Sequence, residues 1–557
     1  MVRYERLRRG TKMKSIVGPW IAKEKKYTYW ENDTYSIWCS GIFWVEKVDD
    51  VFSVAEKAFA GTLNYNDVCG WFRIVFHQKE LDKYLFFGDH TGSRIFFMDA
   101  DNGCFSDSFL MLRLQRGTIY PDYQGVACFF DRSSTLGDRT VISGITKTEP
   151  DYYYCLTEGK IEKVNKNLLP FSEVEDKKDF EDVMERLLDR IKGEKVCAAC
   201  TGGFDSRTII AALVHYQKNP DLVVMGYEDN PDVRIARKIA EKTGLLLKVI
   251  HPGDKEENWL EKGALFYDGC YDAVLSYRHF QKARWIKENG YRVEFGGLGG
   301  EFTKGLYYTP VRWGFPRHCD ETFYYEKLIK KTTCQEKWCG AVVRDSIDEY
   351  KTIALNLARK GIAEATMQAA CNAVVYAKLR CGIVAMTNAN CDLFAKVDPM
   401  MDRRLVAAAS QKNHYSLAMN IWERERIAKY CPVLSGIETT GGVTCAVDFV
   451  GLTKDRLRKL AFYVNRILHR IRRKLGLSYT SANPPLWDRD YTAARNTTTW
   501  KEALTCCKKW GFVNENIHED EIPLNQTGNI LVLGIVFAEN FESIFKEHSQ
   551  TLYGMEE

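Results

Sequence analysis

The chain has 557 residues, of which 45% are hydrophobic and 27% charged, a composition typical of a globular protein with more than one domain. Its formal net charge of +4 is close to balance for this length, so we expect no nucleic acid as a partner. The eighteen cysteines show no regular spacing and no apolar leader opens the chain, which favours reduced thiols and a cytoplasmic location over a disulfide scaffold.

The first part of the chain reads as a basic tail over residues 1–26, expected to be disordered, followed by a β-rich domain over residues 27–165. Short runs of aromatic and branched residues alternate there with Gly, Asp and Asn, which predicts a mostly antiparallel domain with few helices. The predicted strands are Ile37–Val45, Trp71–Phe76, Tyr84–Phe87, Arg94–Met98 and Tyr152–Leu156.

A polar stretch begins near residue 163, and we assign an interdomain linker to residues 166–178. Strands then alternate with helices, which predicts a parallel sheet with ligands at the carboxyl ends of its strands. This second domain is placed at residues 179–450 and becomes predominantly helical beyond about residue 345. Its predicted elements are the helices Phe180–Lys192, Ser206–Gln217 and Val233–Thr243 and the strands Lys195–Cys200, Leu222–Tyr227 and Leu245–Ile250.

The last part, residues 451–557, is expected to be a helical extension. Lys454–Leu475 predicts an amphipathic helix whose polar face is dominated by Lys and Arg. The favoured interpretation is a surface helix packed on the second domain, and a weak contact of Lys454–Lys474 with an anionic membrane surface or an acidic partner is the alternative. The apolar stretch Ile530–Ala538 is too short to cross a bilayer and predicts a buried helix or strand.

The most informative motif is Thr201-Gly-Gly-Phe-Asp-Ser206, between a predicted strand and a predicted helix. Two glycines expose successive backbone N–H groups, and the helix N-terminus adds partial positive charge, so the turn suits a phosphate group. Asp205 offers the hard oxygen ligand that Mg²⁺ prefers. The motif lacks the Gly-Lys ending of a Walker A loop, and the simpler alternative is an ordinary capped turn.

This loop resembles the Ser-Gly-Gly-x-Asp-Ser pyrophosphate loop of the asparagine synthetases and their relatives. Two further segments, Gly226–Gly244 with its Asn-Pro-Asp sequence and Gly290–Tyr307, resemble the next landmarks of that family in order and spacing. The resemblance implies a synthetase domain with the adenine-nucleotide α-hydrolase-like fold and a helical C-terminal part.

The resemblance also implies a set of site residues and a reaction. Asp205 and Glu301 take the two metal-ligand positions, and ATP and Mg²⁺ are the implied cofactors. A substrate carboxylate would attack the α-phosphate to give an acyl-adenylate and pyrophosphate, and an amine would then displace AMP. The residues implied to bind ATP and pyrophosphate are Ala199, Thr201, Gly202, Gly203, Asp205, Ser206 and Gly297.

The chain departs from the family in its second loop, where Leu298 replaces a Glu thought to assist amide formation. The family also carries a lysine that stabilises the adenylation transition state, and no clear motif for it follows the helix near Arg424. Lys429 and Lys304 are candidates by residue type alone, and a solvated lysine is the simpler interpretation of each. Pro399-Met-Met-Asp402 resembles the family's Pro-Phe-Leu-Asp helix entrance, which is scaffold.

The N-terminal region resembles the family's glutamine-hydrolysing domain, a class II amidotransferase of the Ntn-hydrolase-like fold. The segments that carry the likeness are Gly41–Trp44, Gly70–Phe72, Gly88–Phe97 and Gly137–Tyr154. That domain needs an N-terminal cysteine nucleophile. Cys39 lies only about thirty residues before Gly70, so we assign it to an internal strand and expect a degenerate domain without glutaminase chemistry.

Cys197-Ala-Ala-Cys200 has the spacing of a zinc or redox pair, but no second pair follows at zinc-site spacing. A buried structural pair on the strand is therefore the favoured interpretation.

The expected function is that of an ATP-dependent, AMP-forming carbon–nitrogen ligase that forms an amide or lactam. Its partners would be a small-molecule or peptide carboxylate and an amine donor, as in the β-lactam synthetases and lasso-peptide cyclases, relatives without the N-terminal cysteine. One alternative is an asparagine synthase fed with free ammonia. Another is a nucleotide-binding pseudoenzyme or scaffold. The sequence does not indicate the oligomeric state.

Overall fold

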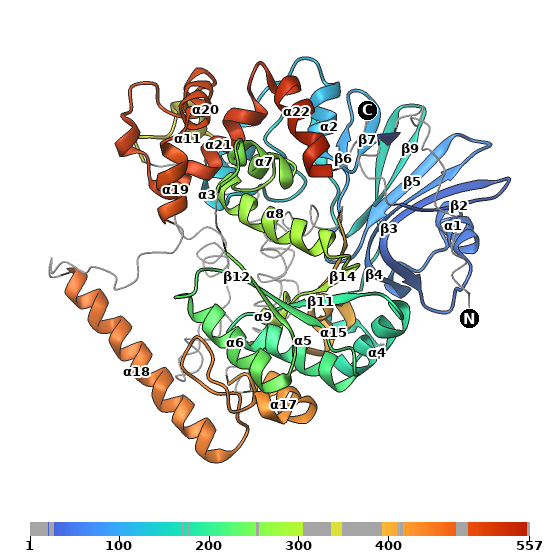
Figure 1. The fold of residues 1–557 in the computed structure, drawn as a ribbon. Coiled ribbons are helices and arrows are strands. Elements are labelled where there is room, and N and C mark those ends of the chain that lie inside the picture. The colour runs from blue at the N-terminus through green and yellow to red at the C-terminus, as the bar shows by residue number, and fades with distance from the viewer. Residues whose placement is uncertain are drawn as a thin grey trace.

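The computed structural model is a mixed α/β molecule that contains an antiparallel sheet, a small sheet, a parallel sheet and many helices (Figure 1). It describes residues 20–21, 27–169, 171–175, 178–251, 255–304, 336–347, 393–409, 412, 416–417, 419–474 and 488–553. Most of the basic tail, the end of the segment Gly290–Tyr307 and residues 348–392 of the helical region predicted beyond residue 345 lie outside these residues.

The antiparallel sheet has the strand order β10-β9-β5-β4-β3-β2. Its centre is the long pair β3 and β4, which runs in register from Tyr35 opposite Gln78 to Val45 opposite Val68. One face packs against the helix α1, and the other packs against the small sheet through stacked rings such as Phe86 and Phe105. The bounds are β2 (Thr28–Glu31), β3 (Tyr35–Val45), α1 (Val51–Phe59), β4 (Val68–Gln78), β5 (Lys83–Gly88), β9 (Tyr152–Thr157) and β10 (Lys160–Asn165).

The small sheet has the order β1-β7-β6-β8, with β1 parallel to β7 and the other pairs antiparallel. The predicted strand Arg94–Met98 begins later than expected because Arg94 turns inward, where its guanidinium pairs with the Ser40 hydroxyl. The bounds are β1 (Trp20–Ile21), β6 (Phe97–Asp99), β7 (Cys104–Ser106), α2 (Phe109–Gln115), α3 (Tyr123–Arg132) and β8 (Ile145–Lys147).

The interpretation of Cys39 as part of an internal strand is confirmed. Cys39 lies in the middle of β3, with β2 before it and paired to it, and its side chain is 2% exposed.

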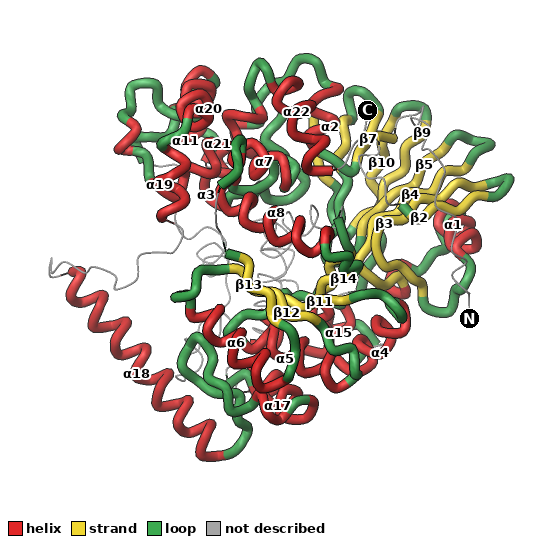
Figure 2. The backbone as a smooth tube through the Cα atoms, viewed as in Figure 1, coloured by secondary structure: helices red, strands yellow, loops and turns green. Residues whose placement is uncertain are grey.

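The parallel sheet has the order β13-β12-β11-β14-β15, and all its pairs are parallel, as the alternation of strands and helices predicted (Figure 2). Side chains on successive residues of β12 point to opposite faces, so Val223 joins one core and Leu222 and Val224 join another. The bounds are β11 (Val196–Ala199), β12 (Asp221–Met225), β13 (Leu247–Ile250), β14 (Val293–Phe295) and β15 (Ala395–Val397).

Helices cover both faces of this sheet. The helices α4, α5, α6 and α17 pack on the face of Leu222, and α7 and α8 pack on the face of Val223 (Figure 1). The predicted helices thus begin and end within two residues of the observed ones. The bounds are α4 (Phe180–Arg190), α5 (Phe204–His215), α6 (Pro231–Thr243), α7 (Trp259–Phe266), α8 (Ala273–Glu288), α9 (Gly300–Lys304), α15 (Arg403–Ala409) and α17 (Ile421–Tyr430).

The helices α11, α19, α20, α21 and α22 join α7, α8 and the helices α2 and α3 of the N-terminal region in one hydrophobic core. The predicted apolar element Ile530–Ala538 is the helix α21, and every residue of that helix is buried. The bounds are α11 (Ala341–Asp345), α18 (Phe449–Lys474), α19 (Asp488–Arg495), α20 (Thr498–Lys509), α21 (Thr527–Val536) and α22 (Phe541–Tyr553).

No helix in the described part of the chain is by itself long and apolar enough to cross a membrane. The segments Leu524–Val536 and Phe541–His548 reach the required length and apolarity only as a pair, which is bent by 105°.

The helix α18 forms as predicted, but its apolar face does not pack on the second domain. The side chains of Leu457, Leu460, Val464 and Leu468 are 42–62% exposed. Figure 1 shows the helix running away from the rest of the molecule after its first turns. The favoured interpretation of a packed surface helix is therefore wrong for these residues.

The described residues of the predicted linker pack against the rest of the protein. Within residues 166–178, Phe171 and Val174 are buried in a cluster with Phe302 and Met401. This cluster joins the chain before the parallel sheet to the second loop of that sheet.

Candidate functional site

The motif Thr201–Ser206 lies at the carboxyl end of β11, where the chain turns into α5. Its two hydroxyl groups close the turn, since Thr201 Oγ1 and Ser206 Oγ are 2.9 Å apart and the Thr201 N–H donates to Ser206 Oγ at 3.1 Å. The helix begins at Phe204, so Asp205 stands in its first turn, where the helix dipole favours a negative group.

The second loop, which follows β14, packs directly on the first. Ala198 pairs with Phe295, so Ala199 and the glycine pair that follows Phe295 leave the sheet side by side. A Cβ atom at Gly297 would lie 2.8 Å from the Ser206 nitrogen, and one at Gly300 would collide with the Asp205 carboxylate. Glycine is therefore required at both places for the two loops to approach, and the structure brings together the predicted residues of both.

A third segment of the resemblance reaches the same place. The Gly202 N–H donates to Asp232 Oδ1 at 2.7 Å, and Asp232 is the last residue of the Asn-Pro-Asp sequence that opens α6. On the other side, the Thr440 N–H donates to the Gly202 carbonyl at 3.1 Å. The first loop is thus held between α6 and the segment that follows α17.

Four charged side chains meet beside the first loop. The Lys304 ammonium forms an ion pair with Asp205 Oδ2. Burial, followed by the negative charge of Asp205, raises the pKa of Glu301 above its ordinary value. Burial lowers the pKa of Lys304, but the charges of Glu423 and Asp205 outweigh that effect and raise it. In the described residues this group therefore places three carboxylates, those of Asp205, Glu301 and Glu423, around the Lys304 ammonium.

Glu423 is the member of this group that sequence reasoning missed. It lies on α17, is fully buried, and receives a hydrogen bond from the Asn420 amide at 2.9 Å. Burial, followed by the charge of Asp205, raises the pKa of Glu423 well above its ordinary value. The only signal in the sequence was an acid on a helix face that also carries Trp422 and Ile427, a position where a charge needs a partner.

Two carboxylate oxygens in this group lack a donor among the described residues, namely Asp205 Oδ1 and Glu423 Oε1. If both carboxylates were ionised they would repel each other, so a proton on Glu423 or a bound cation would reduce this repulsion. Asp205 and Glu301 fit a magnesium ion by donor type, because Mg²⁺ in nucleotide sites is commonly held by one or two carboxylates together with phosphate oxygens and water. No group of three His, Cys, Asp or Glu side chains with metal-binding geometry occurs in the described residues.

The two lysine candidates occupy different places. Lys304 stands on α9 at the loops, beside Asp205. Lys429 stands in the last turn of α17, is 61% exposed, and pairs with Glu181 of α4 at 3.0 Å. The structure brings Lys304 to the site and does not bring Lys429 there.

Leu298 lies in the second loop but contributes no polar group to the site. Its backbone N–H donates to Asp398 Oδ1 at 3.1 Å, while its side chain packs against the cluster of Phe171, Val174 and Met401. The residue therefore serves as an apolar contact behind the loop.

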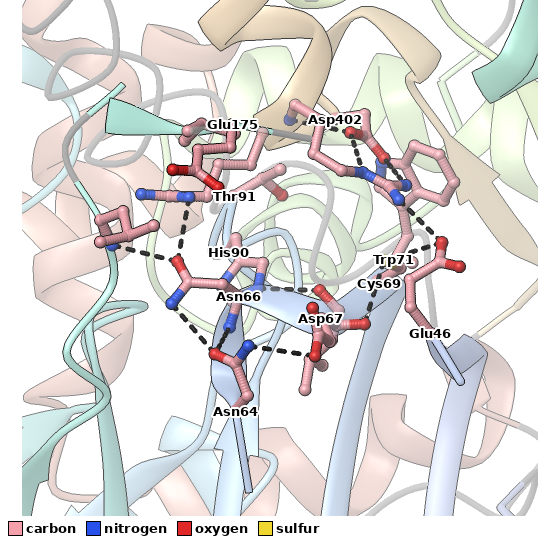
Figure 3. A pocket seen from close by; sticks show the side chains of 16 residues that line it. Glu46, Asn64, Asn66, Asp67, Cys69, Trp71, His90, Thr91, Glu175 and Asp402 are labelled. Carbon is pink, nitrogen blue, oxygen red and sulfur yellow. Dashed lines mark hydrogen bonds and ion pairs between the residues drawn. The ribbon is translucent and has the colours of Figure 1, made fainter. Parts of the chain in front are cut away.

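A cavity of about 160 Å³ lies on the far side of that cluster, between the antiparallel sheet and the start of α15 (Figure 3). Val174 lines the cavity and also belongs to the apolar cluster behind Leu298. Three of the charged groups that line it are engaged with each other, since Arg404 bridges Asp402 and Glu46. Both polar and apolar side chains line the cavity, and no residue of the first loop is among them.

The pair Cys197 and Cys200 is buried, as predicted, on the strand that enters the first loop and directly after it. Burial raises the pKa of Cys200 to about 12, so its thiol stays protonated and unreactive. All thirteen cysteines in the described residues are free thiols.

No protein-family model matches the chain, and no curated protein matches it either.

Proposed function

We propose that the chain is an AMP-forming, ATP-dependent ligase that adenylates a carboxylate and joins it to an amine. The observation that carries the proposal is the meeting of two glycine loops at adjacent parallel strands, with Asp205 and Glu301 beside the N-terminus of a helix. Such an arrangement offers backbone N–H groups and a helix dipole to phosphates and carboxylates to a magnesium ion.

Each charged group would have a defined role in this reaction. Mg²⁺, when bound, would neutralise phosphate oxygens and so assist attack on the α-phosphate. Asp205 and Glu301 would hold the ion, and the N–H groups at the N-terminus of α5 would bind the pyrophosphate as it leaves. Lys304 would stabilise negative charge as it develops, once Mg²⁺ has replaced it as the partner of Asp205. A proton on Glu423 would let this residue keep Asp205 in place without adding a charge.

Amide formation would proceed without a proton carrier from the second loop, because Leu298 cannot transfer a proton. An amine that is already deprotonated, or one with an acceptor of its own, fits such a site better than one that must be deprotonated there. The N-terminal region would supply no ammonia, since Cys39 is an internal, buried residue of β3.

The ion pair of Lys304 with Asp205 also favours a second candidate, a nucleotide-binding scaffold in which the lysine permanently replaces the metal. The two functions differ in one measurable property, because only the ligase would turn ATP over to AMP and pyrophosphate. An asparagine synthase fed with ammonia would show the same turnover only when aspartate is present.

The test is pyrophosphate release with ATP, Mg²⁺ and a panel of amino acids, peptides and small carboxylic acids, alongside direct binding of a non-hydrolysable ATP analogue. We expect at least one carboxylate to stimulate release and the substitution Asp205→Ala to abolish both release and Mg²⁺-dependent binding. Asp182→Ala, at an exposed acid in the first turn of α4, is the matched control and should leave both unchanged. Analogue binding that needs no Mg²⁺, with no release on any carboxylate, would favour the scaffold.

A further inference from the structure

The helix α18 combines an exposed apolar stripe with a strong positive charge. Leu457, Leu460, Val464 and Leu468 recur every three or four residues, so they share one face of the helix over about 17 Å. The exposed side chains of Phe449 and Val450, 80% and 58% exposed, extend the apolar surface towards the start of the helix.

The helix α18 contacts the rest of the protein through the face opposite to its apolar stripe. The carboxylate of Asp455 is buried and pairs with the fully buried Arg424. Val464 follows Asp455 by about two and a half helical turns and therefore lies on the other side of the axis. An amphipathic helix of a globular protein ordinarily buries its apolar face. Here the buried contact is an ion pair, and the apolar stripe points outward.

The positive charge of the helix indicates which kind of surface would cover its apolar stripe. Residues 449–474 contain nine Lys and Arg residues against one acid, Asp455, while the whole chain carries a formal charge of only +4. A second copy of the same helix would set these charges against each other, which disfavours a symmetric pairing of two stripes. A surface that is both apolar and negative matches the helix in both respects.

We propose that α18 binds the surface of an anionic phospholipid bilayer, lying in the interface with Leu457, Val464 and Leu468 inserted between the lipids. Amphipathic helices with a basic polar face and leucine or phenylalanine on the other face bind in this way. Each Lys or Arg near a negatively charged leaflet adds attraction that salt weakens. The ion pair between Asp455 of α18 and Arg424 of α17 would keep the rest of the protein close to the membrane-bound helix.

The test measures co-sedimentation of the full chain with phosphatidylcholine vesicles that do or do not contain phosphatidylglycerol. We expect binding only to the anionic vesicles, and weaker binding at high salt. The triple substitution Leu457→Ser, Val464→Ser, Leu468→Ser should lower binding at least about tenfold. The matched control is Leu81→Ser, Leu246→Ser, Val342→Ser, which alters three comparably exposed apolar residues elsewhere and should bind as the wild type does.

A second variant, Arg466→Glu with Arg470→Glu, tests the charge without touching the stripe and should also lower binding to anionic vesicles. Thermal unfolding of the serine variants should match the wild type, because the substituted leucines and valines are exposed. Several results would overturn the proposal. These are equal binding to neutral and anionic vesicles, unchanged binding of the triple variant, self-association abolished by the triple variant, or capture by poly-glutamate without binding to vesicles.

Discussion

Buried charges are arranged differently in the antiparallel sheet and at the carboxyl edge of the parallel sheet. In the antiparallel region Arg73 and Asp107 are both fully buried and pair at 3.3 Å, and the buried Lys166 ammonium donates to two backbone carbonyls. At the parallel edge three carboxylates share the single ammonium of Lys304, and Asp205 and Glu423 each keep an oxygen without a donor among the described residues.

We interpret the paired charges of the antiparallel region as structural and the excess of carboxylates at the parallel edge as functional. Burying a charge is costly unless it is paired, so a compensated pair stabilises one geometry of the fold. An excess of like charge is stable only if a proton or a cation joins it.

The substitution Asp107→Ala should destabilise the fold strongly, because it leaves the Arg73 guanidinium buried without its carboxylate. Removing one partner of a buried pair costs about 3–5 kcal/mol. The measurement is the free energy of unfolding from denaturant titration. Asp82→Ala is the control, since Asp82 is 77% exposed and its pair with His77 is expected to contribute less than about 1 kcal/mol. Equal effects of the two substitutions would refute the contrast.

The substitution Lys304→Met should lower pyrophosphate release by about 10²–10³-fold while leaving the folded state intact, if Lys304 stabilises charge during the reaction. Removing the ammonium also leaves the carboxylates without a counter-ion, so Mg²⁺ should protect the variant against heat more than it protects the wild type. The quantities measured are the release rate and the Mg²⁺-dependent shift in the melting temperature. A variant as active as the wild type would show that Lys304 is only an ion-pair partner.

The substitution Glu423→Gln should change how stability depends on pH. The folded-state pKa of Glu423 is raised, so its favourable contribution is present below the unfolded pKa and is lost as pH rises through the folded pKa. The wild type should therefore lose more stability than the variant as pH rises above the ordinary pKa of a glutamate. Glu425→Gln, at an exposed acid of the same helix, should leave the pH dependence unchanged. Parallel curves for wild type and Glu423→Gln would mean that Glu423 is ionised.

The substitution Lys429→Met should have the smallest effect. Lys429 is 61% exposed in its pair with Glu181, and exposed pairs contribute about 0–1 kcal/mol. Pyrophosphate release should stay within the error of the wild type. A loss comparable to that of Lys304→Met would move the catalytic lysine to α17 and contradict the placement at the loops.

The sequence predicts the parallel-sheet region from Phe180 to Ile250 well because the signals involved are local. Alternating strands and helices from Phe180 to Ile250 repeat with the periods that each element requires, and glycine pairs mark both loops. Residues close in sequence, such as Thr201, Asp205 and Ser206, can therefore be assigned together from their spacing alone.

The residues that were not predicted depend on contacts between distant segments. Glu423 reaches Asp205 only because α17 packs against α5, and no local pattern places those helices together. Residue type alone could not distinguish Lys304 from Lys429 for the same reason. The outward stripe of α18 also could not be inferred from its period, since an amphipathic pattern specifies two faces but not which one is attached.

The contact between the two glycine loops limits where this chain could be recombined with a homologous one. Gly297 and Gly300 leave no room for a side chain against Ser206 and Asp205, although some ninety residues separate the loops. A chimera whose crossover falls between them would join two loops that were not shaped for each other. Exchange of this region between homologues should therefore preserve its geometry only when residues 201–301 are inherited as one block.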